Sequence, residues 1–263
     1  MERTLRILVA VKHGIDVGLA RADRATGTVA LETAPRKTSD FDRNAVEEAV
    51  RIRERLGGTV TAISVGAPTA KEALRDALTI GADAAVLVAD AALPSFDSRA
   101  VGRVLAAVSR SLGGFDIFLF GEGSSDHFAG LVGPRVAAEL GVADVAYVRK
   151  LTVTATGVVA EKDLERELEI VRAPFPVVLT VGQEINTPRL PTFMATLKAS
   201  KKVIREVTLA EIGLDPTALG ATSRIDRAAV PEVSRKLLPI SGNTPEETAR
   251  ALVIALRSEG ALP

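Results

Sequence analysis

A Gly- and Ser-rich segment near the middle of the chain has the residue types of a phosphate-binding turn. It runs Gly121-Glu122-Gly123-Ser124-Ser125-Asp126-His127-Phe128-Ala129-Gly130-Leu131-Val132-Gly133-Pro134. Because it joins a strand-length apolar run to a helix-period segment, its backbone N–H groups and the helix dipole could hold a phosphate. An ordinary turn between a strand and a helix also uses Gly and Ser, and the spacing alone leaves both interpretations open. The segment is neither a Walker loop nor a G-x-G-x-x-G dinucleotide fingerprint.

Titratable residues accompany this segment, but they form no catalytic set. His127 opens the predicted helix, where the dipole favours a neutral, hydrogen-bonding imidazole, although a surface or capping His fits equally well. Asp126 is expected to be a helix N-cap rather than a general base. Lys12 and Asp16, after the first predicted strand, could touch a ligand. No Ser/His/Asp set, paired-carboxylate site or metal-ligand spacing emerges, so no catalytic or metal-binding residue is predicted.

Composition narrows the class of protein further. The 263 residues include 33 Lys+Arg and 33 Asp+Glu, and this zero net charge gives no electrostatic reason to expect binding to nucleic acid or an anionic membrane. Cysteine is absent, which excludes disulfides, thiolate nucleophiles and cysteine-held clusters. Aromatic residues make up 3%, so base-stacking platforms are not expected. No apolar run approaches the roughly 20 residues that span a bilayer, and no signal peptide is recognised, so we expect a cytoplasmic protein without membrane insertion.

Strand-length apolar runs alternate with helix-period segments through residue 148. The runs are nearly continuous, as in a parallel sheet covered on both faces, and they predict an α/β fold with a doubly wound, mostly parallel sheet. The predicted strands are 5–11, 60–65, 84–88, 115–120 and 142–148, and the predicted helices are 42–56, 69–80, 95–112 and 127–140. Ligands of such sheets bind past the carboxyl ends of the strands where the strand order reverses. The candidate ends are therefore 9–13, 64–68 and 121–134.

The pattern changes near residue 150. Short runs at 151–153, 158–160, 168–171 and 177–181 predict an added β-hairpin region at one edge of the sheet. A polar loop at 183–192 leads to a short helix, and 205–243 is poorly periodic, as expected of an extended C-terminal arm that packs on another chain. Thr244-Pro245-Glu246-Glu247 opens a last helix. We therefore predict an α/β domain over residues 1–204 and an arm with a helix over 205–263.

Several segments, taken in order, resemble the beta subunit of electron transfer flavoprotein over about residues 5–204. The matching pieces are Ile7-Leu8-Val9-Ala10-Val11-Lys12 with Asp16, Phe41-Asp42-Arg43-Asn44-Ala45-Val46-Glu47-Glu48-Ala49, Ala73-Leu74-Arg75-Asp76-Ala77-Leu78 with Gly81-Ala82-Asp83, Asp126 with Val132-Gly133-Pro134, Pro176-Val177-Val178-Leu179-Thr180, Asn186-Thr187-Pro188-Arg189, and Lys198-Ala199-Ser200-Lys201-Lys202. Each piece alone is weak, but their order is specific.

The resemblance implies a flavodoxin-like, adenine-nucleotide-binding domain in a heterodimer with an alpha subunit. The heterodimer would hold an electron-carrying FAD mainly on the alpha subunit, with AMP, or a second FAD in the electron-bifurcating branch, in the beta subunit. The chain would be an electron carrier and not an enzyme by itself. It would pass electrons from a flavin-dependent dehydrogenase to a downstream acceptor such as a quinone oxidoreductase.

The resemblance also assigns residues by position. The implied nucleotide contacts are Ala10, Ser39, Asp40, Phe41, Asp42, Val65, Gly66, Gly121, Gly123, Ser124, Ser125, Asp126, His127, Phe128, Ala129, Gly130, Leu131 and Val132. The implied dehydrogenase-docking loop, 183–200, contributes Arg189, Pro191, Thr192 and Phe193, with Phe193 as the apolar anchor. Asp163 falls where the family has an acid that contacts the flavin domain of the alpha subunit.

The chain departs from the family pattern at some of these positions. Ala129 and Leu131 replace the hydroxyl and amide that would bind phosphates, each bond being worth about 1.5–3 kcal/mol. Thr187 replaces the usual acid of the docking loop, and Arg166-Glu167 replaces paired glycines in the charged hairpin. The alternative function is a stand-alone adenine-nucleotide-binding module of the same fold without a redox role. An ATP-pyrophosphatase relative is disfavoured because Lys12-His13-Gly14-Ile15-Asp16 stands where a Ser-Gly-Gly-x-Asp-Ser loop is expected.

Overall fold

Two compact units make up the chain. The computed structural model describes residues 4–23, 25–31, 33–91, 93, 97–220, 222–223, 226, 228–229 and 236–262. The first unit is Met1–Ala228 and the second is Ala229–Pro263. Each unit is described by itself.

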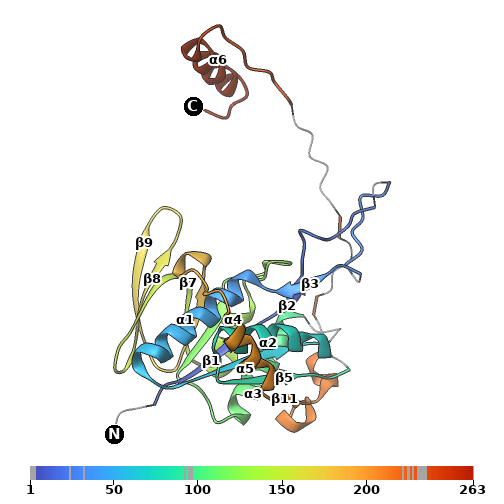
Figure 1. Cartoon of the computed structure of the whole chain (residues 1–263), viewed down its shortest axis with the longest axis vertical. Helices are drawn as coiled ribbons and strands as arrows, with labels where there is room; N and C mark the ends of the chain where they lie inside the picture. Colours follow the sequence, from blue (N-terminus) through green and yellow to red (C-terminus); the bar gives the residue numbers. More distant parts are fainter. Residues whose placement is uncertain are drawn as a thin grey trace. The chain divides into compact units, whose positions relative to one another are not determined.

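A nine-stranded sheet forms the centre of the first unit, in the order β11-β5-β4-β1-β6-β10-β7-β8-β9 (Figure 1). Its strands, in chain order, are β1 Arg6–Ala10, β4 Thr59–Val65, β5 Ala84–Val88, β6 Ile117–Gly121, β7 Ala143–Val153, β8 Gly157–Asp163, β9 Leu168–Pro174, β10 Val177–Val181 and β11 Ile204–Val207. All neighbours from β11 to β7 pair in parallel, whereas β8 pairs antiparallel with both β7 and β9. The predicted doubly wound, mostly parallel sheet is confirmed. A separate antiparallel pair joins β2 His13–Ile15 to β3 Arg36–Thr38.

Helices cover both faces of this sheet. The helices of this unit are α1 Asp40–Leu56, α2 Lys71–Ile80, α3 Ser98–Ser111, α4 Val132–Leu140 and α5 Phe193–Lys201, with short 3-10 helices at Pro68–Ala70, Gln183–Ile185, Ala210–Ile212 and Pro216–Leu219. Ile7 and Val9 of β1 pack in the apolar cluster that contains α1 and α2, and Leu8 packs in the cluster that contains α3 and α4. Successive strand residues point to opposite faces. The fully buried strands therefore need apolar residues throughout, which explains their continuous apolar runs.

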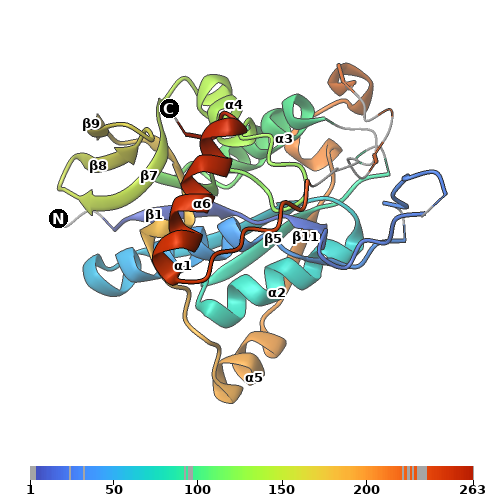
Figure 2. The same ribbon diagram turned by 90° about the horizontal axis from the view of Figure 1, so that it is seen from above.

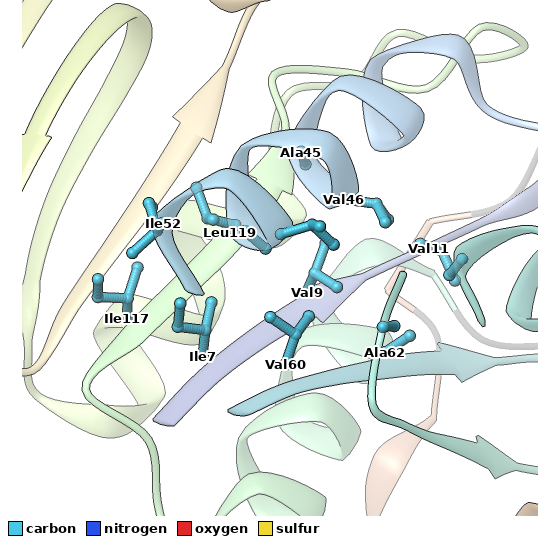
Figure 3. Packing of buried hydrophobic residues seen from close by; sticks show 14 of the residues in the cluster. Ile7, Val9, Val11, Ala45, Val46, Ile52, Val60, Ala62, Ile117 and Leu119 are labelled. Carbon is cyan, nitrogen blue, oxygen red and sulfur yellow. The ribbon is translucent and has the colours of Figure 1, made fainter. Parts of the chain in front are cut away.

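Helix α1 packs along β1 and β6. Figure 3 shows its Ala45, Val46 and Ile52 on the same side of the sheet as Ile7 and Val9. These five side chains are all fully buried. Figure 2 shows α5 beside α2 at the margin of the unit, and Ala199 is the one α5 residue that is buried.

The predicted hairpin region is confirmed for β7, β8 and β9 but is wrong for residues 177–181. These residues form β10, which lies between β6 and β7 inside the parallel sheet. All five are buried. Their continuous apolar pattern is that of an interior strand, but the pattern alone does not say which strands are its neighbours.

The predicted boundary at residue 204 differs from the boundary that the contacts define. Strand β11 extends the sheet by pairing with β5, and Val207, Leu209 and Leu219 are buried in the core of the first unit. The Asp97 carboxylate also accepts a hydrogen bond from the Thr222 amide at 2.8 Å. The segment after 204 therefore continues the domain because its scattered apolar residues reach the existing core. Residues 230–235 of the predicted arm lie outside the described residues.

The second unit holds one described helix, α6 Pro245–Ser258. Thr244 caps it as predicted, since its hydroxyl accepts a hydrogen bond from the Glu247 amide at 3.2 Å. No helix in the described part of either unit is long and apolar enough to cross a membrane.

The last residue of β6, Gly121, allows α1 to approach the sheet closely. A Cβ placed on Gly121 would lie 2.6 Å from Phe41 Cβ and 2.7 Å from Asp42 Oδ1. Gly66, at the corresponding edge after β4, has room, because its added Cβ would meet Ala70 Cβ at 3.6 Å.

We expect Gly121→Ala to lower the free energy of unfolding by about 1–3 kcal/mol, because the helix start must move away from the strand. Gly66→Ala is the matched control and should be close to neutral. Urea denaturation of the two variants measures the difference. Equal stabilities would show that α1 does not depend on this close approach.

Candidate nucleotide site and docking loop

The candidate nucleotide site lies where the strand order reverses. The chain proceeds from β1 to β4 and β5 on one side, then returns to place β6 on the other side of β1. The carboxyl ends of β1 and β6 therefore diverge into the crevice that such sheets use for ligands. The predicted segments 9–13 and 121–134 meet here, since Lys12 Nζ lies 3.2 Å from Ser124 Oγ.

Asp42 joins the two strand ends to α1. Its Oδ2 accepts a hydrogen bond from the Lys12 amide at 2.7 Å, and its Oδ1 accepts one from the Gly121 amide at 3.2 Å. The residue is buried, and burial raises the pKa of Asp42 to about 7 even though the two amides oppose the shift. Both carboxylate oxygens therefore bond to backbone amides of the chain itself, and Asp42 holds the two strand ends together.

The Asp126 carboxylate is the second internal anchor of the site. It accepts hydrogen bonds from Lys12 Nζ at 2.6 Å, from the His127 amide at 2.8 Å and from the Ile15 amide at 3.1 Å. Burial raises its pKa, but the hydrogen bonds from His127, Lys12 and Ser124 outweigh this and hold the pKa well below its ordinary value. Asp126 therefore stays ionised and neutralises Lys12.

The prediction that Asp126 caps a helix that starts near His127 is wrong. Helix α4 begins at Val132, and Leu131 occupies its N-cap position. Residues 126–131 instead form an open loop, in which His127 Nδ1 lies 3.2 Å from Lys12 Nζ. The backbone is not helical here because Phe128 and Gly130 adopt left-handed conformations, with φ of 45° and 63°.

Aromatic and hydroxyl contacts fix the rest of this loop. The Phe128 ring packs on the Phe41 ring with centroids 5.3 Å apart. Gly123 leaves room for it, because a Cβ there would lie 2.7 Å from the Phe128 ring. Ser125 Oγ accepts a hydrogen bond from the Asp40 amide at 3.0 Å. Loop 121–132 is thus attached to the start of α1, which brings together residues that the resemblance implies as nucleotide contacts.

Unused polar groups at this site match what a phosphate or a ribose requires. The Ser39 hydroxyl is buried and has no partner among the described residues. None of the described residues accepts a hydrogen bond from the amides of residues 129–132. Ala129 and Leu131 supply no polar side chain, so the donors here are backbone N–H groups at the start of α4. The residues present therefore fit an anionic ligand that is held by the backbone.

Other predicted contacts lie along the same edge. Ala10 ends β1, Val65 ends β4, and the Gly66 amide donates to the Val88 carbonyl at 3.1 Å. In the part of the chain that the structure describes, no group of His, Asp and Glu residues is placed to hold a metal ion.

The predicted docking loop is tied to α1 by ion pairs of Arg189, one of which is made to the buried Glu47. Arg189 Nε lies 2.8 Å from Glu47 Oε2, and Arg189 Nη1 lies 2.7 Å from Glu54 Oε1. The Glu47 side chain is 2% exposed and also pairs with Arg51 at 2.7 Å. Burial raises the pKa of Glu47, but the bonds from Arg189 and Arg51 outweigh it and lower the pKa overall. The Arg189 guanidinium is therefore an internal anchor of the loop rather than a free docking group.

Asn44 provides a second tether for this loop. Its amide nitrogen donates to the Asn186 carbonyl at 2.7 Å and to the Gln183 carbonyl at 3.3 Å, and Asn186 Nδ2 donates back to the Asn44 carbonyl at 3.1 Å. The sequence alone predicted no role for Asn44, Glu47 or Asn186 in holding this loop. Their partners are 142 residues away in the chain, so no local spacing could reveal them.

The apolar part of the docking loop is exposed. Thr192 caps α5 by accepting a hydrogen bond from the Ala195 amide at 3.1 Å, and Pro191 precedes it. Leu190 is 87% exposed and Phe193 is 81% exposed. Met194 and Leu197 continue this surface, which we call the apolar docking row, Leu190–Phe193–Met194–Leu197.

Asp163 lies elsewhere, at the end of β8 in the hairpin, where its carboxylate is 3.3 Å from Arg149 Nη1.

The fold and the site together define an α/β protein whose candidate ligand loop lies at the switch point of a mostly parallel sheet. Residues 26–212 match the electron transfer flavoprotein domain. The chain is 34% identical over 258 residues to the electron transfer flavoprotein subunit beta of Thermoanaerobacterium thermosaccharolyticum, which covers 97% of this chain and 98% of the relative. It is 30% identical to the Megasphaera elsdenii subunit over 97% of this chain and 93% of that protein. It is 34% identical to the Bacillus subtilis subunit over 89% of this chain and 91% of that protein. The chain belongs to the electron transfer flavoprotein family, and the resemblance inferred from its motifs is confirmed.

The raised pKa of Asp42 makes the stability depend on pH. The pKa of Asp42 is about 7 in the folded protein and 3.8 ordinarily. Between about pH 4 and pH 7, Asp42 is therefore protonated in the folded protein and ionised in the unfolded chain. The contribution of this proton to the free energy of unfolding is therefore complete below pH 4 and is lost as the pH rises to 7.

We expect Asp42→Asn to remove this dependence. The free energy of unfolding of wild type, relative to Asp42→Asn, should fall by up to about 4 kcal/mol from pH 4 to pH 8. Urea denaturation of both proteins at several pH values measures the difference. A difference that stays constant with pH would show that Asp42 is ionised throughout this range.

Proposed function

We propose that the chain is the beta subunit of a heterodimeric electron carrier, which shuttles electrons from a flavin-dependent dehydrogenase to a downstream acceptor such as a quinone oxidoreductase. The supporting observation is that the family match, residues 26–212, includes both the switch-point loop and the docking loop. The electrons would reside on an FAD that is held with an alpha subunit. In this proposal the chain is a carrier and not a catalyst, and its own residues bind, orient and dock.

We further propose that the switch-point site holds an adenine nucleotide, either AMP or a second FAD. The amides of residues 129–132 and the Ser39 hydroxyl would receive the phosphate and sugar groups. Lys12 would not meet a phosphate directly, because its amine is neutralised by Asp126. The two side-chain bonds missing at Ala129 and Leu131 would weaken binding by about two to four decades compared with a site that has them.

The nucleotide content of the complex tests this proposal. The chain is co-expressed with its alpha subunit, the purified complex is denatured, and the released nucleotides are quantified by mass spectrometry. One FAD and one AMP per heterodimer is the expected result for a one-flavin carrier, and two FAD would place the protein in the bifurcating branch. FAD alone would overturn the nucleotide site, and a flavin-free homodimer that binds AMP tightly would favour the stand-alone module.

The apolar docking row supports a docking role for residues 190–197. Large apolar side chains that are this exposed on a helix tied to the domain are typical of binding anchors. Asp163, on the exposed hairpin, is proposed to contact the flavin domain of the alpha subunit.

We expect Phe193→Ala to raise KM for the cognate dehydrogenase at least about tenfold, the loss of roughly 1.4 kcal/mol or more from one anchor. Nucleotide content should not change, because Phe193 lies on α5 and not at the switch point. Leu56→Ala, which truncates an exposed Leu at the end of α1, is the control. Equal steady-state kinetics for wild type and Phe193→Ala would refute the docking anchor.

A further inference from the structure

A pocket of about 370 Å³ opens between the start of α1 and the docking loop. Asp40, Arg43 and Asn44 of α1 line one side, and Gln183, Asn186 and Thr187 line the other. This pocket does not include loop 121–132, but it shares Asp40 with the implied nucleotide contacts and so adjoins the candidate nucleotide site.

In the part of the chain that the structure describes, Arg43 is the one cation that lines the pocket. Among the described residues it makes no ion pair, and the structure gives its guanidinium no hydrogen-bond acceptor, although the side chain is partly buried. The neighbouring acid is already used, because Asp40 Oδ2 lies 2.9 Å from Lys37 Nζ. Lys37 Nζ also lies 4.0 Å from Asp16 Oδ1, so two carboxylates of this region are paired with the same amine. A guanidinium that lacks a partner is best satisfied by a carboxylate, which matches its planar donors.

The pocket and the apolar docking row lie on one segment of the chain. Thr187 and Pro188 line the pocket, and Leu190 and Phe193 follow them. Interfaces commonly combine an apolar anchor with nearby charges that select the partner. A protein that buries Leu190 and Phe193 would therefore contact the segment that also forms one wall of the pocket.

The walls of the pocket are held in place before any partner arrives. The Asn44–Asn186 hydrogen bonds cross between α1 and the loop within the pocket lining. The ion pairs of Arg189 with Glu47 and Glu54 fix the loop just beyond it. Such preorganisation reduces the entropy lost when a partner binds.

We propose that the Arg43 pocket receives a carboxylate side chain of the docking dehydrogenase, which makes Arg43 a specificity-determining residue of the docking surface. The inference rests on the proposed docking function of residues 183–200. It adds a polar contact, and hence a required acidic group on the partner, to the apolar anchor.

The test uses the assembled heterodimer and its cognate dehydrogenase. Arg43→Gln is compared with Arg43→Lys and with Arg55→Gln, which removes the same charge from an exposed position at the far end of α1. We expect Arg43→Gln to raise KM about five- to twentyfold with kcat unchanged, and to flatten the increase of KM with ionic strength. Arg43→Lys should keep most of the salt dependence, and Arg55→Gln should behave as wild type.

The outcomes separate this inference from the proposed function. If Phe193→Ala impairs docking but Arg43→Gln and Arg55→Gln have the same KM and salt dependence, the carboxylate pocket is refuted while docking stands. If Phe193→Ala has no effect either, the docking function itself fails. Melting of the heterodimer with added inorganic phosphate or acetate checks for a free ligand. Arg43-dependent stabilisation by inorganic phosphate at millimolar concentration, with none by acetate, would instead make the pocket a phosphate site and overturn the proposal.

Discussion

The Asp42 carboxylate makes the contact on which the arrangement of this protein depends. It spans the gap between the diverging ends of β1 and β6 and gives each backbone amide an acceptor. Those amides lie where the β1–β6 ladder has ended, so they would otherwise be half-buried donors without partners. By satisfying both, Asp42 fixes the start of α1 against the switch point. The absence of a Cβ on Gly121 lets the helix come close enough to do so.

From that fixed start, α1 carries two different surfaces. Its first turn contacts loop 121–132 through Asp40 and Phe41, and its middle turns hold the docking loop through Asn44 and Glu47. Glu47 is almost completely buried, and a buried carboxylate is tolerated only when cations and donors surround it. The Arg189 and Arg51 guanidinium groups meet that requirement. A single helix therefore positions the proposed nucleotide site and the proposed docking surface.

The candidate site has few polar side chains, and its unused donors belong to the backbone. Asp126 provides the internal negative charge that neutralises Lys12, and no described residue accepts a hydrogen bond from the amides of residues 129–132. Such a loop depends on backbone geometry, with Phe128 and Gly130 in left-handed conformations. Ala129 and Leu131 supply no polar side chain, but the backbone N–H donors of the loop remain.

The sequence by itself determined the class of fold, the parallel strands β1, β4, β5 and β6, and the helices that cover them. These follow from local apolar periodicity, which reports whether a segment is buried on one face or two. Its ordered motifs also identified the family. The tertiary structure alone decided that β10 lies inside the sheet, that the domain continues past residue 204, and that Asp126 and Arg189 have internal partners. Each of these depends on pairing between residues that are far apart in the chain, such as the 142 residues that separate Glu47 from Arg189. A local pattern records that a residue is buried or charged, but only the folded chain determines which distant group meets it.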